Sequence, residues 1–371
     1  MPDLAEVMRR HWPPYEKKYG SDMPASHKKA ARAILSCRTA EAGMVFHQCG
    51  DCGKYESSPV SCGHRACNAC GGHKAIEWEA RQLARLLPVP YHMVTFTVPS
   101  EFREIFRKNQ CLMYDIFFRE SAAALSTLAA DPKHLGGEIG MTGVLQTWTR
   151  DLRYHPHIHY LVPGGALTAD GWVRPKNPDV LVPAKPLAAM MRNRFRDALK
   201  AADFKLYMTL PARFWKKPWN VDARRAGSGA TAFGYLARYV QKTALDAARI
   251  LAVTDETVTF RWTDRESGET RTQTVTGEEF LRRFLQHVLP KGFTRVRHFG
   301  FLSPAAKKKY ERVRSLLRAG AIVLKLPAKP VVACPCCGAA MHFVAMIRPS
   351  RARPPPTPPK PATPSPRPAA A

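Results

Sequence analysis

The pattern of apolar and polar positions predicts alternating strands and helices in the central part of the chain. The run YHMVTFTV at 91–98 is apolar and of strand length, which predicts a buried strand. Residues 101–130 are rich in Ala, Leu and Phe and contain neither Pro nor Gly, which predicts a long helix. Strand-like stretches follow at 139–147 and 157–162, and the second of them ends at a Pro-Gly-Gly turn signal.

The second half of the chain continues this mixture and adds one clear hairpin. Further helices are predicted at 186–202, 231–248, 277–288 and 304–318. The segments TVTFRW (257–262) and ETRTQTV (269–275) are separated by a Ser-Gly turn, which is a hairpin signature. Strands and helices in this mixed order predict an α+β protein whose sheet is covered by helices on one face.

Breaks in the pattern divide the chain into four predicted segments. They are a helical, Cys/His-rich module at 1–86, a central α+β domain at 87–250, a β-hairpin with helices at 251–325, and a C-terminal segment at 326–371. The end of the last segment is rich in Pro, Ala and Arg and has no acidic residue. Such a composition predicts a disordered arm that is weakly attracted to DNA.

The charge balance favours a polyanionic partner. The 371 residues include 57 Lys and Arg against 30 Asp and Glu, which gives a formal net charge of +27. Each phosphate that a basic residue neutralises releases condensed counterions, so such a charge suits nucleic acid. Codon bias toward Arg, or attraction to anionic lipid, would produce a similar excess, so the charge supports nucleic acid without establishing it.

The sequence predicts neither secretion nor membrane insertion. The N-terminal residues contain no apolar signal core, and no uninterrupted apolar run is long enough to span a bilayer. We therefore expect a cytoplasmic protein that does not bind membranes. Thiols stay reduced in that compartment, so the ten cysteines indicate metal ligands rather than disulfides.

Two CxxC pairs predict a structural zinc site near the N-terminus. Cys49 and Cys52 form the first pair, Cys67 and Cys70 form the second, and fourteen residues separate them. A CxxC turn can place two thiolates about 2.3 Å from one zinc ion, and two such turns complete a tetrahedron. We expect these four cysteines to bind one zinc ion.

Other potential metal ligands lie nearby and near the C-terminus. Those close to the CxxC pairs are His47, Cys62, His64 and His73, each of which could replace a ligand or contribute to a second ion. The motif CPCCG offers Cys334 and Cys337 as another half-site, for which Cys336 and His342 are possible partners. The sequence leaves these alternatives open.

A His-x-His pattern in a predicted strand indicates a second kind of metal site. His157 and His159 alternate with an apolar residue, so both project to one face of the strand. Two imidazoles on a rigid strand can hold a divalent cation and leave positions open for phosphate oxygens. Histidines that simply satisfy a core produce the same pattern, so the motif alone is weak.

Two tyrosines on a predicted helix offer a nucleophile. Tyr235 and Tyr239 are four residues apart and therefore lie on one helix face. A phenol with a pKa near 10 is a poor nucleophile, but a divalent cation and basic residues such as Arg238 and Lys242 would help its phenolate attack a phosphodiester. The alternative is that both tyrosines only pack against the core.

The order of these motifs resembles the IS91-type transposases, which belong to the HUH endonuclease superfamily. Matching stretches are VLQTWTRDLRYHPHIHYLVPGG (144–165), YLARYVQKTA (235–244), RRFLQHVLPKGFTRVRHFGFL (282–302) and the terminal CPCCG. The likeness covers most of the chain from about 45 to 338. It implies a ferredoxin- or RRM-like antiparallel sheet as the catalytic domain, at 87–250, in a bacterial, nucleoid-associated protein.

The resemblance also implies roles for individual residues. His157 and His159 would bind the catalytic Mg²⁺ or Mn²⁺, with Gln146 on the neighbouring strand as third ligand. Tyr235 and Tyr239 would be paired nucleophiles in the rolling-circle-like transposition of single-stranded DNA, at transposon ends and target, through a 5′-phosphotyrosine. Apart from the resemblance, basic residues that could bind the DNA phosphates are Arg238 and Lys242 near the tyrosines, and Arg295 and Arg297, which could equally form a solvated strand face.

The chain departs from these relatives at one place. They tend to carry Arg-His-Cys before the last CxxC pair, whereas this chain has Arg65-Ala66-Cys67. Two other functions are compatible with the motifs. One is another HUH enzyme, a plasmid replication initiator or a relaxase, and the other is a zinc-dependent DNA-binding protein without catalytic activity.

Overall fold

The structure is a computed structural model that describes residues 2–241, 244–264, 267–328 and 331–348. These residues form two compact units. The larger unit contains Met1–Cys37 and Ser61–Pro330, and the smaller contains Arg38–Val60 with the described part of Val331–Ala371. Among the described helices, none has the length and apolar character needed to cross a membrane.

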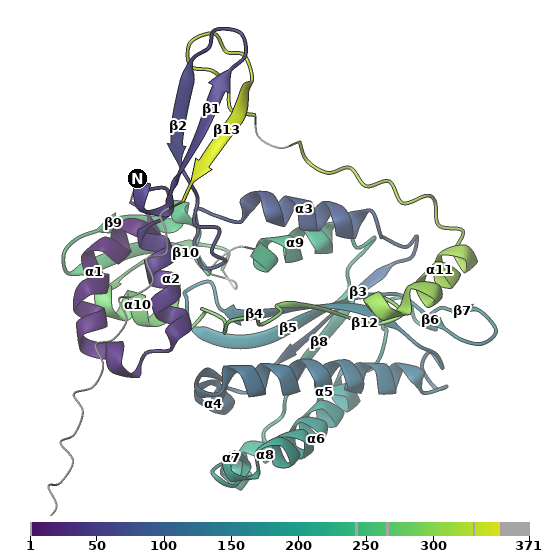
Figure 1. Cartoon of the computed structure of the whole chain (residues 1–371). Helices are drawn as coiled ribbons and strands as arrows, with labels where there is room; N and C mark the ends of the chain where they lie inside the picture. The colour runs from purple at the N-terminus through teal and green to yellow at the C-terminus, as the bar shows by residue number, and fades with distance from the viewer. Residues whose placement is uncertain (1, 242–243, 265–266, 329–330, 349–371) are drawn as a thin grey trace, which may run out of the picture. The chain divides into compact units, whose positions relative to one another are not determined.

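An antiparallel sheet of five strands forms the centre of the larger unit (Figure 1). In the order β12-β4-β5-β3-β8, the strands are Val296–Gly300, Gly140–Trp148, Tyr154–Pro163, Tyr91–Thr97 and Asn220–Arg225. The predicted strands at 91–98, 139–147 and 157–162 are therefore confirmed. Strand β5 lies in the middle of the sheet and begins at Tyr154, so His155 is also part of it.

Helices cover both faces of this sheet, so the prediction of a single covered face was wrong (Figure 1). One face packs against α4 (Arg103–Lys108), α5 (Gln110–Ala130) and α6 (Ala184–Ala202). The other lies against α3 (Gly72–Leu83), α9 (Ala230–Gln241) and α11 (Lys307–Leu316). The physical reason is that the strands carry apolar residues on both sides: Ile158 and Tyr160 enter the first core, and Leu161 enters the second.

The helix predicted at 101–130 is broken near its start. Asn109 has φ −123° and ψ 45°, outside the helical region, and separates α4 from α5. Its side-chain amide donates to the carbonyl oxygen of Ile105 at 3.2 Å, which is how an asparagine competes with the helix backbone. Arg103 therefore stands at the first position of a short separate helix.

A second hydrophobic core joins the N-terminal helices to the predicted hairpin. The hairpin is confirmed as β10 (Thr257–Thr263) and β11 (Thr270–Thr276), and β9 (Ile250–Val253) extends it to three strands. The packed helices are α1 (Leu4–Tyr19), α2 (Ala25–Leu35) and α10 (Gly277–Leu285). Shorter elements complete the larger unit: β6 (Ala166–Leu167), β7 (Trp172–Val173), α7 (Phe204–Met208) and α8 (Ala212–Lys216).

The smaller unit is a three-stranded antiparallel sheet in the order β13-β1-β2. Its strands are β1 (Met44–Cys49), β2 (Tyr55–Pro59) and β13 (Met341–Ile347), none of which the sequence pattern predicted. Gly43 has φ +106°, and a Cβ atom there would lie 2.4 Å from the Ile347 carbonyl oxygen, so only glycine allows this close pairing. The pairing of β1 with β13 brings together segments from opposite ends of the chain.

Candidate functional site

Four cysteines of the larger unit gather into one cluster, which we call the first cysteine cluster: Cys37, Cys62, Cys67 and Cys70. Sulfur–sulfur distances are 3.5 Å for Cys37–Cys70, 3.6 Å for Cys37–Cys67 and 3.7 Å for Cys62–Cys70. A tetrahedral zinc ion about 2.3 Å from each sulfur separates neighbouring sulfurs by about 3.8 Å. The cluster therefore has the donor atoms and the spacing of a closed structural zinc site.

Four cysteines of the smaller unit form the second cysteine cluster: Cys49, Cys52, Cys334 and Cys337. The sulfurs of Cys49 and Cys337 are 3.5 Å apart, and those of Cys52 and Cys334 are 3.6 Å apart. Pairing of β1 with β13 supplies the missing half of the CPCCG motif. This spacing also suits a tetrahedral zinc ion.

The grouping of the two CxxC pairs around one ion was therefore wrong. The pair Cys67 and Cys70 joins Cys37, which lies just beyond the end of α2, and Cys62. The pair Cys49 and Cys52 joins the C-terminal pair instead, because strand pairing places it there. Cys37 has no CxxC partner, so spacing gave no signal for it.

The nearby histidines have other contacts. Nδ1 of His64 accepts a hydrogen bond from the Ala66 amide, and Nε2 of His73 is 3.1 Å from Oε1 of Glu77. The ring of His47 packs edge-on against that of Phe343. Both clusters thus consist of cysteines alone. Relatives tend to carry a histidine where this chain has Ala66, and the absence of that histidine removes no ligand from either cluster.

Arg65, the residue before Ala66, links the first cysteine cluster to the segment that precedes strand β12. Its Nη1 donates to the Phe293 carbonyl oxygen at 2.7 Å, and its Nη2 donates to the Leu289 carbonyl oxygen at 3.1 Å and to that of Pro290. These carbonyls belong to the segment that leads into β12. Arg65 therefore connects the chain between Cys62 and Cys67 to the segment before β12.

Replacing Cys334 with serine is expected to lower the zinc content from about two ions per chain to about one, because a closed site needs four ligands. Metal analysis of the purified full-length chain measures this. Cys336→Ser is the matched control, since Cys336 is exposed and lies outside the cluster, and it should keep both ions. An undiminished zinc content in Cys334→Ser would refute the second site.

The paired histidines lie side by side on the face of β5 that packs under α9. The ring centroids of His157 and His159 are 4.8 Å apart, and each residue is 8% exposed. Gln146 lies opposite His157 in the β4–β5 register, and its Oε1 is 3.3 Å from His159 Nε2. The structure thus brings together all three residues that the sequence suggested as ligands of a divalent cation.

The hydrogen bonds around the histidines test whether they suit a cation. Nδ1 of His157 donates to the His155 carbonyl oxygen at 2.7 Å, and Nδ1 of His159 is 2.9 Å from the Thr95 hydroxyl. Metal-binding histidines usually have their second ring nitrogen held in this way. These contacts leave the Nε2 atoms of both histidines and the Gln146 amide oxygen as the donor atoms that suit a divalent cation.

Both candidate tyrosines belong to helix α9, which packs on the histidine face of the sheet. The Tyr235 ring centroid is 5.9 Å from that of His159, with the ring planes at 84°. Tyr239 lies one turn later in the same helix. The side chains of Arg238 and Tyr239, and the whole of Lys242, lie outside the described residues.

The structure does not place Arg295 and Arg297 at the histidines. Arg297 projects to the opposite face of the sheet, where it pairs with Asp115 and lies 4.6 Å from the Phe118 ring centroid. Arg295 lies 5.4 Å from the Trp148 ring centroid, and burial lowers its pKa to about 10. Both side chains are thus engaged with hydrophobic cores.

Sequence reasoning missed two residues that touch the histidine strand. Thr95 lies opposite His159 in the β3–β5 register, so a correct strand pairing would have indicated it. Arg103 donates through Nη2 to His155 Nδ1 at 2.8 Å. No sequence pattern gave this contact, because it depends on the break between α4 and α5.

Two family models match the chain. A transposase zinc-binding domain matches residues 7–98, and a putative transposase family matches residues 140–310. A putative transposase, y4qJ of Sinorhizobium fredii, is 35% identical over 340 residues, covering 85% of this chain and 84% of that protein. The transposase for insertion sequence element IS801 of Pseudomonas savastanoi pv. phaseolicola is 28% identical over 295 residues, covering 73% and 68%. No solved structure matches the chain.

Proposed function

Because the chain belongs to the IS91 family of DNA-cleaving and strand-transferring transposases, we propose that it cuts and rejoins single-stranded DNA through a 5′-phosphotyrosine intermediate. The observation that carries this proposal is the position of Tyr235, whose ring centroid is 5.9 Å from that of His159. A potential nucleophile thus lies beside a donor set that fits a divalent cation. DNA is the partner of a transposase, and we propose that the form bound here is a single strand at transposon ends and target.

The fold supports this assignment. A central antiparallel sheet with a His-x-His pair on its middle strand is consistent with the ferredoxin- or RRM-like domain of HUH endonucleases. His157, His159 and Gln146 would hold Mg²⁺ or Mn²⁺, which when bound polarises a phosphoryl oxygen. The place of action would be the cytoplasm, at the bacterial nucleoid.

The proposed step is written for Tyr235, because its ring lies near that of His159, and the same chemistry is open to Tyr239. The Tyr235 phenol gives up its proton to solvent, and its oxygen forms a bond to phosphorus while the bond from phosphorus to the 3′-oxygen breaks. The departing 3′-oxygen takes a proton from water, and the downstream strand stays on the tyrosine through its 5′-phosphate. A 3′-hydroxyl can reverse this step and join a strand without ATP. Tyr239, one helical turn away, would serve a second cleavage.

Tyrosine substitutions test the proposal. Wild-type protein with Mg²⁺ or Mn²⁺ and single-stranded DNA from the element's ends is expected to form an adduct that resists denaturant. Tyr235→Phe and Tyr239→Phe should each reduce the adduct, and the double variant should abolish it. Tyr55→Phe is the control, because Tyr55 is exposed in the smaller unit. Undiminished adduct in the double variant would refute the assignment of the nucleophiles.

A further inference from the structure

A cavity lined by arginines opens beside the start of strand β5. Its volume is about 330 Å³, and we call it the arginine cavity after five of its lining residues: Arg103, Arg107, Arg153, Arg282 and Arg283. They come from α4, from the residue just before β5, and from α10. Residues far apart in the sequence therefore converge on one small space next to the histidine strand.

The arginine cavity carries excess positive charge. Among the residues that the structure describes, three carboxylates lie within ion-pair distance of these guanidiniums: Glu104, Asp151 and Glu279. Five arginines against three carboxylates leave two positive charges in excess. The Arg153 and Arg282 side chains are 69% and 56% exposed, so a ligand can reach them from solvent. This balance favours an anion.

Hydrogen bonds connect the arginine cavity to the proposed metal ligands. Arg103 Nη2 donates to His155 Nδ1 at 2.8 Å, and since arginine cannot accept, the proton of a neutral His155 must be on Nε2. The His155 carbonyl oxygen accepts from Nδ1 of His157 at 2.7 Å. Arg103 Nε is buried and has no hydrogen-bond partner among the described residues. Arg103 is therefore a positioning residue at the inner end of the cavity.

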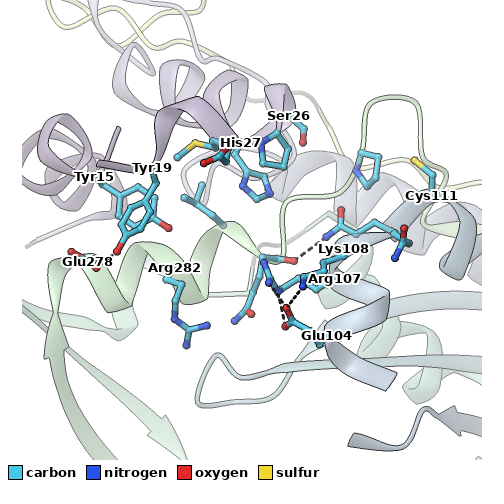
Figure 2. A pocket seen from close by; sticks show the side chains of 18 of the residues that line it. Tyr15, Tyr19, Ser26, His27, Glu104, Arg107, Lys108, Cys111, Glu278 and Arg282 are labelled. Atoms are coloured by element: carbon cyan, nitrogen blue, oxygen red, sulfur yellow. Dashed lines mark hydrogen bonds and ion pairs between the residues drawn. The ribbon is translucent and has the colours of Figure 1, made fainter. Parts of the chain in front are cut away.

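A larger neighbouring cavity of about 1010 Å³ does not share this preference (Figure 2). Its basic lining residues are Arg107, Lys108 and Arg282, and its acidic ones are Asp22, Glu104, Glu278 and Glu279. His27 adds no charge near neutral pH, because burial lowers its pKa to about 4. With more acidic than basic groups, the larger cavity disfavours a polyphosphate chain despite its size.

We infer that the arginine cavity binds the phosphodiester backbone of a single DNA strand and directs it to His155, His157 and His159. The inference rests on the proposed function, because it assigns a path to the strand that would be cut. A cavity of this volume lies at the lower end of the range for small-ligand pockets, so it suits a phosphate with its sugar rather than a duplex. Arg153 and Tyr154, which line the cavity, directly precede His155, so the cavity lies at the end of the sheet where the histidine strand begins.

The salt dependence of binding tests this path. Fluorescence anisotropy with labelled oligothymidylate in EDTA measures affinity without cleavage, on the full-length protein. Each phosphate contact contributes about 0.7 to the slope of log affinity against log salt for single strands, so Arg153→Gln with Arg282→Gln should lower the slope by about 1.4. Arg103 stays unchanged in this test, because its loss would also release His155.

A second double variant makes the result specific. Arg192→Gln with Arg196→Gln removes the same charge from α6, a helix that does not line the arginine cavity, and Arg196 is also paired with a carboxylate. This control should keep the wild-type slope. An unchanged slope in the cavity variant, or an equal fall in both variants, would overturn the inference. Binding in EDTA does not require tyrosine chemistry, so a failure of the proposed cleavage mechanism would be seen separately in the adduct assay.

Discussion

Replacing His159 with alanine is expected to reduce strand cleavage by about a hundredfold or more, which is the usual loss when one stabilising group is removed from a reacting phosphoryl or acyl centre. His159 contacts Gln146 and Thr95, and its ring centroid is 5.9 Å from that of Tyr235, so its loss removes a proposed cation ligand beside the nucleophile. Quantifying nicked, end-labelled oligonucleotide with Mg²⁺ or Mn²⁺ measures the effect. The zinc content should stay unchanged, since both cysteine clusters are made of other residues.

His134→Ala is the matched control for this loss. His134 follows α5, makes a backbone hydrogen bond to Asp131, and belongs to neither the histidine strand nor a cysteine cluster. The control should cleave at the wild-type rate. Wild-type cleavage by His159→Ala would instead show that His159 does not bind the catalytic ion, and the proposed site would have to be abandoned.

Replacing Cys67 with serine is expected to remove one zinc ion and to unfold much of the larger unit. Cys67 is 2% exposed and packs in the second hydrophobic core with Trp148 and Phe284. Binding of structural zinc contributes about 10–16 kcal/mol in small zinc domains, whereas whole proteins are stable by only about 5–15 kcal/mol. Metal analysis and thermal unfolding of the purified protein measure the two effects.

Cys111→Ser gives the comparison for Cys67→Ser. Cys111 is exposed on α5 and lies outside both clusters, so its replacement should change neither zinc content nor unfolding temperature. If Cys67→Ser keeps all of its zinc and its stability, the first cysteine cluster is not a metal site. A loss of zinc without loss of stability would show that the ion does not support the core.

Local patterns in the sequence predicted the elements that carry the proposed chemistry. Alternation of apolar and polar residues located the histidine strand, and the helix predicted at 231–248 located α9, which ends earlier, at Gln241. These predictions depend on residues within one turn or one strand, where periodicity is a strong signal. The proposed cation ligand Gln146 also followed from adjacent strands, because β4 and β5 are neighbours in both sequence and sheet.

Features that depend on distant pairing could not be predicted in this way. The second cysteine cluster joins Cys52 to Cys334 across 282 positions, and only the pairing of β1 with β13 reveals it. The direction of Arg297 depends on the register between β12 and β4, which sequence spacing does not determine. The arginine cavity likewise required α4, β5 and α10 to meet in space.

The polarity of the protein–DNA linkage tests the central claim most directly. Single-stranded DNA from the element's ends would be labelled at either its 5′ or its 3′ end, incubated with the wild-type protein and Mg²⁺ or Mn²⁺, and separated under denaturing conditions. A 5′-phosphotyrosine predicts that only the 3′-label stays on the protein, on a peptide containing Tyr235 or Tyr239, while the 5′-labelled fragment is released with a free 3′-hydroxyl. Retention of the 5′-label, or cleavage without any covalent adduct, would contradict the proposed mechanism.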